Sequence, residues 1–324
     1  MKRIAVVGAG MGGLSALHTL ANAGCEVTVF DKSRGSGGRM ATKKLNAASW
    51  DMGAQFLRSH SNAFRLQLAH WQQQGWIETW PIVPDRIDHH GIHTSEDDVQ
   101  RFVGVSRMTA LCRQLLTPAH EFHTATRIIS CTKRVDGWML SDEQEQHFGP
   151  FDGLIINTPP EQAQPLLTAS PTLFDHPKPD MLPCWTLLLA FDLPLATTVN
   201  AAFVEGSPIA WIARNSSKPQ RDALQTWVIQ ADHDWSQERV DSPREQVQET
   251  LLAAFFDALK LPSQPCTEIW LHRWLYAIPA APLEQGALID QAQQLAVCGD
   301  WCHSASVEGA WLSGQAAARA LLES

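Results

Sequence analysis

The chain has 324 residues, 44% of them hydrophobic, and a formal net charge of −9. This length allows two domains, or one domain with a second grown out of it. The acidic balance argues against a surface for nucleic acid or anionic membranes, and no apolar run approaches the roughly 20 residues that span a bilayer. The N-terminus superficially resembles a signal peptide, but glycines interrupt its apolar stretch. Seven scattered cysteines without a CxxC pair predict neither a disulfide framework nor a zinc site, and favour the reducing cytoplasm.

The first forty residues carry the strongest motif. Lys2–Val7 is a short apolar run rich in β-branched residues, which predicts a strand, and the glycine-rich turn Gly8–Gly13 follows at once. Leu14–Ala23 has helical spacing, and Glu26–Phe30 predicts a second strand that ends at Asp31. A strand, a glycine turn, a helix, a strand and then an acid about 20 residues past the glycines form the dinucleotide-binding fingerprint.

Each part of this fingerprint has a physical role. Gly8 allows the tight turn, Gly10 lets the backbone approach a pyrophosphate, and Gly13 lets the helix pack close to the strand. The helix N-terminus offers free N–H groups and its positive dipole end to phosphates. Asp31 can accept hydrogen bonds from a ribose diol. A purely structural turn is the alternative, but the motif favours a cofactor site made of Gly8, Gly10, Met11, Gly12, Gly13 and Asp31.

A second glycine-rich loop, DKSRGSGGRM, runs from Asp31 to Met40. NAD-binding domains do not usually need such a loop. The order GxGxxG, acid and GGR resembles the FAD-binding domain of the flavin oxidases related to monoamine oxidase. The resemblance implies that Arg39 lies over the FAD pyrophosphate near the flavin, in a loop that also contributes Lys32, Gly38 and Met40. A flexible linker is the alternative for this loop, but a linker would not need Arg39.

Two further stretches match the same family. Residues 51–56, DMGAQF, resemble its D-x-G-x-x motif, whose small residues let a flat ring approach the backbone. Residues 126–128 resemble the strand end that holds the adenine, which implies a cofactor role for Ile128. For the first stretch, the resemblance implies positions beside the flavin for Gly53, Ala54, Gln55 and Phe56.

The C-terminal part of the chain carries the closing motif of the family. Gly299-Asp300 follows an apolar strand, and a helix then runs from Val307 to about Leu322. In the family the aspartate hydrogen-bonds the ribityl chain, and the helix N-terminus points its dipole at the flavin, where it stabilises the negative charge of the reduced ring. The resemblance thus implies cofactor roles for Gly299, Asp300, Val307, Glu308, Gly309 and Ala310.

The two distant motifs together predict one cofactor, FAD. A covalent cysteinyl flavin at Cys302, as in monoamine oxidase, is the alternative, but Trp301-Cys302-His303-Ser304 does not match that attachment motif. We therefore expect FAD to be bound without a covalent bond. The patch of His89, His90 and His93 has no matching cysteine or second cluster, so a solvated loop is expected there rather than a metal site.

These motifs predict an α/β chain. We expect a Rossmann-like FAD-binding domain with an inserted α+β substrate domain on a mostly antiparallel sheet, an architecture similar to p-hydroxybenzoate hydroxylase. The FAD-binding domain is predicted to be discontinuous, with residues 1–70, 105–160 and 290–324, and the substrate domain to take residues 71–104 and 161–289. Within the latter, Ser242–Leu259 reads as a helix with Ser242 as its N-cap and Pro243 at its first position.

Three segments carry a closer resemblance, Trp211–Pro219, His272–Ala277 and Cys298–Gly314. With DKSRGSGGRM and DMGAQF they look like the bacterial renalases over essentially the whole chain. That family oxidises the 2- and 6-dihydro isomers of NAD(P) to NAD(P)+, with O2 reduced to H2O2. A dihydronicotinamide already carries a transferable hydride, so no catalytic side chain beyond the flavin is required.

The substrate contacts are expected from three side chains. Trp185 is a candidate for an apolar wall or a core residue, Arg214 for a carboxamide or phosphate ligand or a surface salt bridge, and Tyr276 for a carboxamide ligand. The expected partners are a small-molecule substrate and O2, without nucleic acid or membrane. Oligomeric state and isomer preference stay open. The alternatives are an amine or polyamine oxidase, whose usual tyrosine pair the single Tyr276 cannot supply, and a non-catalytic FAD-binding protein.

Overall fold

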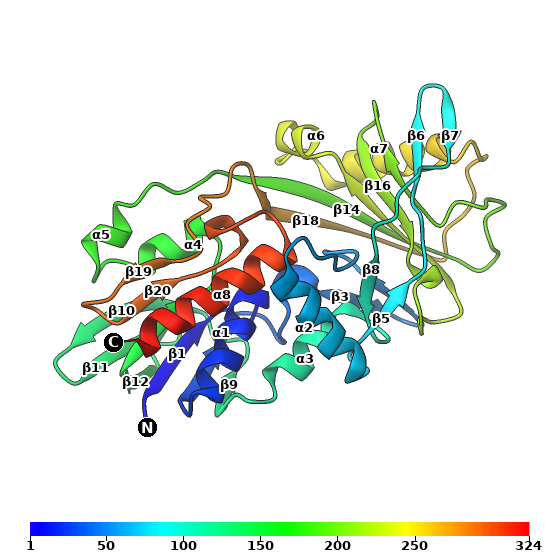
Figure 1. Ribbon diagram of the computed structural model, residues 1–324. Helices are drawn as coiled ribbons and strands as arrows, with labels where there is room; N and C mark the ends of the chain where they lie inside the picture. Colours follow the sequence, from blue (N-terminus) through cyan, green and yellow to red (C-terminus); the bar gives the residue numbers. More distant parts are fainter. Residues whose placement is uncertain (324) are drawn as a thin grey trace. The chain divides into compact units, whose positions relative to one another are not determined.

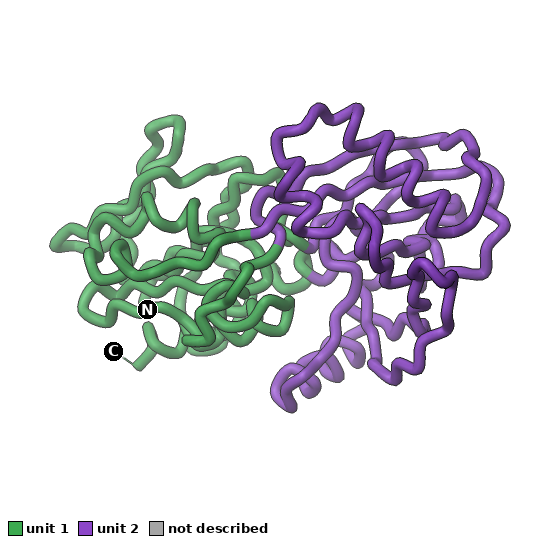
Figure 2. Tube along the Cα trace, turned by 90° about the horizontal axis from the view of Figure 1, so that it is seen from above, with its two compact units in different colours: residues 1–39, 112–181, 278–324 green, residues 40–111, 182–277 purple. Residues whose placement is uncertain are grey.

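The computed structural model describes residues 1–323, which form two compact units (Figure 1). Unit 1 consists of Met1–Arg39, Cys112–Met181 and the chain from Ile278 onward, and unit 2 of Met40–Leu111 and Leu182–Ala277. Figure 2 traces unit 1 in green and unit 2 in purple, each assembled from segments far apart in the sequence. Within the described residues, no helix combines the length and hydropathy needed to cross a membrane.

The centre of unit 1 is a six-stranded sheet in the order β19-β20-β13-β1-β2-β9. Neighbouring strands are parallel, except for the antiparallel pair β19–β20. Continuous apolar runs such as that of β1 suit the interior of a parallel sheet that is covered on both faces. The strands are β1 (Arg3–Val7), β2 (Glu26–Phe30), β9 (Glu121–His123), β13 (Gly153–Ile156), β19 (Leu288–Asp290) and β20 (Leu295–Val297).

Helices α1 (Met11–Asn22) and α8 (Val307–Leu322) lie side by side in unit 1 (Figure 1). The Ser15 hydroxyl of α1 donates to the Trp311 carbonyl of α8 at 2.7 Å. A Cβ atom at Gly314 would lie 2.0 Å from the Gly12 carbonyl oxygen, so the close approach of the two helices requires glycine there.

The remainder of unit 1 covers and connects the sheet. An antiparallel sheet of three strands packs on Phe30 of β2 through the rings of Phe148 and Phe151. The strands of this sheet are β10 (Ile128–Arg134), β11 (Gly137–Asp142) and β12 (His147–Phe151). The remaining elements of unit 1 are the helices α4 (Pro160–Ala163) and α5 (Pro171–Phe174) and the short turns η1 (Gly38–Met40), η2 (Gln164–Leu166) and η4 (Asp300–Cys302).

Unit 2 is built on a seven-stranded sheet in the order β18-β14-β17-β16-β15-β6-β7. The pairs β14–β17, β17–β16, β16–β15 and β6–β7 are antiparallel, and β15–β6 is parallel. The strands are β6 (Asp85–Asp88), β7 (Gly91–His93), β14 (Met181–Phe191), β15 (Ala201–Val204), β16 (Ile209–Arg214), β17 (Gln225–Ala231) and β18 (Glu268–Pro279).

The two faces of this sheet differ. Helix α7 (Arg244–Ala258) packs Val247, Leu251 and Phe255 on one face, which we call the α7 face. The opposite face meets Trp50, whose indole N–H donates to the Leu189 carbonyl at 2.8 Å, and we call it the β4 face. The other elements of unit 2 are β3 (Thr42–Leu45), β4 (Ala48–Asp51), β5 (Ile77–Trp80), β8 (Arg101–Gly104), α2 (Asn62–Gln73), α6 (His233–Glu238) and η3 (Asn215–Ser217). Helix α3 (Met108–Leu116) begins in unit 2 and continues into unit 1 from Cys112 onward.

The observed architecture confirms the predicted fold class, but the units divide the chain differently from the predicted domains. Residues 40–70 join unit 2, because Trp50 packs on its sheet. Residues 161–181 join unit 1, where the Ser170 hydroxyl donates to Asp290 at 2.5 Å, and residues 278–289 also belong there. Helix α7 has Pro243 rather than Ser242 at its N-cap, without a side-chain cap.

Candidate active site

The glycine turn of unit 1 connects β1 to α1 as predicted. Gly8 adopts φ 106°, a left-handed conformation that favours glycine, and its N–H donates to the Phe30 carbonyl at 2.7 Å. Gly10 is the N-cap of α1. A Cβ at Gly13 would lie 2.1 Å from the Gly8 carbonyl oxygen. The turn therefore leaves no room for a side chain at Gly8 or Gly13. The free N–H groups at the N-terminus of α1 are suited to bind an anion.

Asp31 holds this turn in place. Its carboxylate accepts from the Ala9 N–H at 2.8 Å and from the Ser33 N–H at 2.7 Å, and the residue is 8% exposed. A carboxylate has about four acceptor positions, so two remain for a ribose diol. The Asp31 carbonyl also accepts from the Thr126 N–H at 2.9 Å, which ties the acid to the segment before β10. Ile128, the predicted adenine contact, is the buried first residue of β10.

The second glycine loop lies directly against the first. The Gly37 N–H donates to the Ala9 carbonyl at 2.8 Å, and a Cβ at Gly38 would lie 3.6 Å from the Gly10 Cα. The Lys32 ammonium donates to Gln162 at 2.9 Å, and burial, with nearby Arg127, lowers its pKa. The buried hydroxyl oxygen of Ser36 has no hydrogen-bond partner in residues 1–323. Such an orphaned donor beside two glycine loops fits a phosphate ligand.

Arg39 and Asp300 meet in an ion pair, although 261 positions separate them in the sequence. The two guanidinium nitrogens of Arg39 donate to the two carboxylate oxygens of Asp300 at 2.7 and 2.5 Å. The Asp300 side chain is 7% exposed and that of Arg39 is 32% exposed. The structure thus brings the predicted pyrophosphate and ribityl ligands into one place, as a single cofactor requires.

The N-terminus of α8 also reaches the glycine turn. The hydroxyl of the N-cap residue Ser306 accepts from the Gly309 N–H at 2.9 Å. A Cβ at Gly309 would lie 2.0 Å from the Ser304 carbonyl, and one at Gly12 would lie 3.1 Å from the Ala310 carbonyl. Two helix N-termini therefore converge on the same side of unit 1, and both favour a negatively charged ligand.

Two residues of this site were missed by the sequence analysis. Asn157, just after β13, donates from its side-chain amide to the Gly8 carbonyl at 3.1 Å. The buried hydroxyl oxygen of Thr158 next to it has no hydrogen-bond partner among the described residues. Polar residues that follow a buried parallel strand lie at the carboxyl edge where ligands of such sheets bind. Their position after a four-residue apolar strand was the signal that could have found them.

In unit 2, side chains of the large sheet hold the predicted flavin-facing segment Gly53–Phe56 and the residues before it. The Gln230 amide of β17 donates to the Gly53 carbonyl at 2.8 Å. The Trp274 indole of β18 donates to the Met52 carbonyl at 3.2 Å. The Phe56 ring packs against that of Trp211 with centroids 5.8 Å apart. The β4 face thus presents a fixed backbone with small residues at Gly53 and Ala54.

Trp185 and Arg214, two of the three predicted substrate contacts, lie on the α7 face of the sheet and not on the β4 face. Trp185 is 1% exposed in the core of the α7 face, and its indole donates to the Arg239 carbonyl at 3.0 Å, which favours the core interpretation. The Arg214 guanidinium donates to the Thr197 and Val199 carbonyls at 2.8 and 3.1 Å, and burial lowers its pKa.

Tyr276 lies on β18 two residues from Trp274. Successive side chains of a strand alternate between faces, so both point to the β4 face. Tyr276 is therefore the predicted substrate contact that stays on the same face as the Gly53–Phe56 segment.

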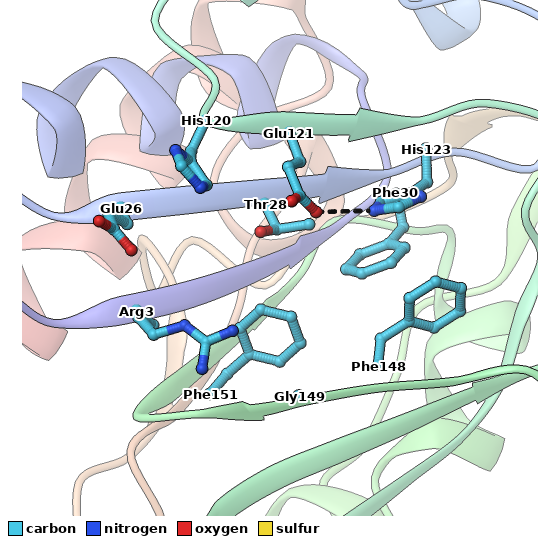
Figure 3. Close-up of a pocket in the computed structure, with 10 residues that line it drawn as sticks. All are labelled: Arg3, Glu26, Thr28, Phe30, His120, Glu121, His123, Phe148, Gly149 and Phe151. Atoms are coloured by element: carbon cyan, nitrogen blue, oxygen red, sulfur yellow. Dashed lines mark hydrogen bonds and ion pairs between the residues drawn. The ribbon is translucent and has the colours of Figure 1, made fainter.

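A separate cavity of unit 1 does not belong to this site. Its volume is about 100 Å³, and the rings of Phe30, Phe148 and Phe151 gather in it beside the paired Glu121 and His123 (Figure 3). Sites for drug-sized ligands occupy roughly 300–1,000 Å³. The cavity is too small for a dinucleotide and contains none of the predicted cofactor residues.

Neither a metal site nor a reactive Cys302 thiol is found among the side chains that the structure describes. Within residues 1–323, no group of three His, Cys, Asp or Glu is arranged to hold a metal ion. His93 instead contacts Asp88 at 3.2 Å on the β6–β7 hairpin. Burial raises the pKa of the Cys302 thiol well above its ordinary value, which keeps it protonated and a poor nucleophile.

The site of unit 1 fits FAD. A pyrophosphate fits the two glycine loops, where a Cβ at Gly38 would lie 3.6 Å from the Gly10 Cα, and fits the orphaned hydroxyl of Ser36. Arg39 can neutralise phosphate charge, while Asp31 and Asp300 can bind the diol and polyol groups of a dinucleotide.

Comparisons with solved structures agree in fold. The chain superposes over its whole length on a candidate protoporphyrinogen oxidase from Exiguobacterium sp. 255-15, with a TM-score of 0.79, 12% identity and 99% of that chain covered. Putrescine oxidase bound to putrescine gives a TM-score of 0.72 at 11% identity, covering 100% of this chain and 99% of the other.

Sequence comparisons identify the family. An L-amino-acid oxidase from Bothrops moojeni is 39% identical over 153 residues, a match that spans 38% of this chain and only 30% of the oxidase. The profile of the NAD(P)-binding Rossmann-like domain matches residues 6–68, and that of flavin containing amine oxidoreductases matches residues 83–322. The chain therefore belongs to the flavin-containing amine oxidoreductase family, which supports non-covalently bound FAD as its cofactor.

Proposed function

We propose that this enzyme, like the bacterial renalases it resembles, oxidises the 2- and 6-dihydro isomers of NAD(P) to NAD(P)+ and passes the electrons to O2, which gives H2O2. When bound, FAD supplies the hydride acceptor and the reaction with oxygen. The protein has to stack two planar rings and hold the substrate in register. The cysteines of the described residues are all free thiols, which supports the reducing cytoplasm as the proposed location.

The observation that carries this proposal is the convergence of three resembling segments within unit 2. Residues 51–56 contact the Trp211–Pro219 segment, because the Lys218 ammonium donates to the side-chain oxygen of Gln55 at 3.2 Å. They contact the His272–Ala277 segment through the 3.2 Å hydrogen bond from the Trp274 indole to the Met52 carbonyl. Segments up to about 220 residues apart in sequence thus meet on the β4 face.

This surface is aromatic and suits a planar substrate. Trp211 of β16 packs against Phe56, and on β18 the ring of His272 packs against that of Trp274 at 4.4 Å. Burial lowers the pKa of His272 to about 4, with Arg244 and Lys43 acting in the same direction. The imidazole is therefore uncharged at neutral pH. A neutral ring does not oppose the positive charge that the nicotinamide acquires on oxidation.

The decisive experiment is anaerobic reduction of the yellow holoenzyme. We expect borohydride-reduced NAD+, a mixture of dihydro isomers, to bleach the flavin absorption rapidly, and pure 1,4-NADH to do so at least about tenfold more slowly. Putrescine and L-amino acids, added under the same anaerobic conditions, test the alternative function, amine oxidation. Bleaching by amines and not by the isomers would assign the protein to amine oxidation instead.

Amine oxidation is the second candidate because of the relatives. Putrescine oxidase shares the fold, and L-amino-acid oxidases share sequence over part of the chain. Against it stands the aromatic content of the β4 face, where Tyr276 is the only tyrosine of the whole chain and the remaining rings are Trp, Phe and His.

Tyr276→Phe tests the substrate surface. The change removes one hydroxyl that can hydrogen-bond the carboxamide and keeps the ring, so we expect the anaerobic reduction rate with the dihydro isomers to fall roughly fivefold, in line with a loss of about 1 kcal/mol. FAD content and flavin spectrum should stay unchanged. Val135→Ala, at a fully exposed turn of unit 1, is the mock substitution; equal rates in both variants would remove Tyr276 from the site.

A further inference from the structure

The small cavity of unit 1 lies between the six-stranded sheet and β12 of the three-stranded sheet (Figure 3), and all the residues that line it belong to this unit. The parallel register of the six-stranded sheet sets Arg3 beside Glu26 and Thr28 beside Glu121. Because successive side chains of a strand alternate between faces, Glu26, Thr28 and Phe30 of β2 share the face that looks into the cavity.

The cavity has a charged end and an aromatic end. Arg3 and Glu26 lie at one end, the rings of Phe30 and Phe148 lie at the other, and Thr28 lies between them (Figure 3). Phe30 is completely buried, and the Phe148 ring contacts it edge to face with centroids 5.0 Å apart. A molecule that suits this space therefore has polar groups at one end and an apolar group at the other.

The two charged side chains at the polar end have opposite signs and do not pair with each other. The Arg3 guanidinium lies over the Phe151 ring at 5.5 Å, and the Asp152 carboxylate accepts from the backbone N–H of Arg3 instead. Within residues 1–323, neither the Arg3 guanidinium nor the Glu26 carboxylate takes part in an ion pair or a hydrogen bond. Both charges are therefore available to a ligand.

Thr28 supplies a buried polar group between the two ends. The residue is 7% exposed, and its hydroxyl has no hydrogen-bond partner among the described residues. Glu121, its neighbour in register, instead contacts His123 at 3.1 Å. Buried polar side chains almost always have a hydrogen-bond partner, so the Thr28 hydroxyl indicates a bound molecule in the cavity.

The volume limits the size of this molecule. The cavity measures about 100 Å³. Because an apolar cavity of about 150 Å³ holds benzene, a ligand of about five or six non-hydrogen atoms fits here. A small cation or a small anion would pair with only one of Arg3 and Glu26, whereas a molecule that carries both charges pairs with both.

We propose that the cavity binds a small α-amino acid as a zwitterion, with its carboxylate on Arg3, its ammonium on Glu26 and its apolar side chain toward Phe30 and Phe148. The Thr28 hydroxyl can donate to the carboxylate. Because Arg3 is exposed and exposed ion pairs contribute little, we expect a dissociation constant on the order of 1 mM for L-alanine. The site is separate from the FAD site and does not depend on the proposed function.

Equilibrium dialysis of the holoenzyme against radiolabelled L-alanine, under anaerobic conditions, tests the site. We expect saturable binding of L-alanine. Propionate lacks the ammonium group and ethylamine lacks the carboxylate, so each should compete at least about tenfold more weakly than unlabelled L-alanine. Absence of L-alanine binding, or competition by propionate or ethylamine as strong as that by L-alanine, would overturn the proposal.

Substitutions assign the binding to this cavity. Arg3→Met and Glu26→Gln should each weaken L-alanine binding at least about tenfold. Thr28→Val keeps the shape of the side chain and should weaken binding roughly fivefold, and it decides if a charge variant does not fold. Arg134→Met and Glu145→Gln make the same replacements at exposed positions of unit 1 and should bind L-alanine normally. Unchanged binding in all three cavity variants would refute the assignment.

The flavin absorption of the same samples separates this cavity from a substrate site at the flavin. Glu26→Gln should lose L-alanine binding and still be reduced by the dihydro isomers at the wild-type rate. A parallel loss of binding and of reduction in this variant would place L-alanine at the flavin and overturn the proposal. If the isomers fail to reduce every protein, including the wild type, the proposed function is lost, while the dialysis result for the cavity stands.

Discussion

A Gly13→Ala variant should fail to retain FAD. The added Cβ would lie 2.1 Å from the Gly8 carbonyl oxygen, 3.0 Å from the Asn157 amide nitrogen and 3.2 Å from Val6 Cγ1. The nearest of these atoms is backbone, held by the bond from the Gly8 N–H to Phe30, so it cannot move away as a flexible side chain would. A cost of about 3 kcal/mol or more at the binding site weakens FAD more than a hundredfold.

The matched control for this variant lies in the neighbouring glycine loop. Gly35→Ala adds the same methyl group where nothing lies within 4 Å of the new Cβ. After gel filtration with added FAD, we expect a full flavin-to-protein absorbance ratio for Gly35→Ala and almost none for Gly13→Ala, with equal far-ultraviolet circular dichroism. Full FAD retention by Gly13→Ala would show that the turn is not the cofactor site.

The sequence was sufficient for the fold of unit 1 because its signals are local. The glycine turn and Asp31 lie within one βαβ unit, so their spacing determines their arrangement. Asn157 and Thr158 carry no such motif, and their contribution depends on β13 lying parallel to β1, a pairing that joins residues about 150 positions apart. The sequence could predict the strand but not which neighbour it would meet.

The direction of side chains was harder to predict than the strands that carry them. Arg214 does end a strand, as expected, but the register of β16 against β17 shifts between Ile209 and Trp211. Such a bulge changes which face each later residue occupies. The same limitation applies to the buried contact between the Lys218 ammonium and the Asp51 carboxylate. The two residues are 167 positions apart, and neither lies in a sequence pattern that indicates the other.

Removal of either partner of the Arg39–Asp300 pair should weaken FAD binding by tenfold to a hundredfold. Charge-assisted hydrogen bonds contribute about 1.5–3 kcal/mol each. Arg39→Ala removes the cation expected at the pyrophosphate and also leaves the 7% exposed Asp300 carboxylate without its bidentate partner. Asp300→Ala removes the expected ribityl acceptor. Titration of apoprotein with FAD, followed by fluorescence quenching, measures both losses.

Arg39 and Asp300 contact each other directly through two hydrogen bonds, so the effects of replacing them can be tested for additivity. If the two residues bind FAD as one unit, the double variant should lose less affinity than the sum of the single losses, because each single change already disrupts the other side chain. Arg39→Lys keeps the charge but not the two parallel donors, so its affinity should lie between the wild type and Arg39→Ala. Arg319→Ala removes an exposed arginine from α8 of the same unit and should bind FAD normally. Additive losses in the double variant would mean that Arg39 and Asp300 contact separate parts of the cofactor and that their ion pair does not contribute to binding.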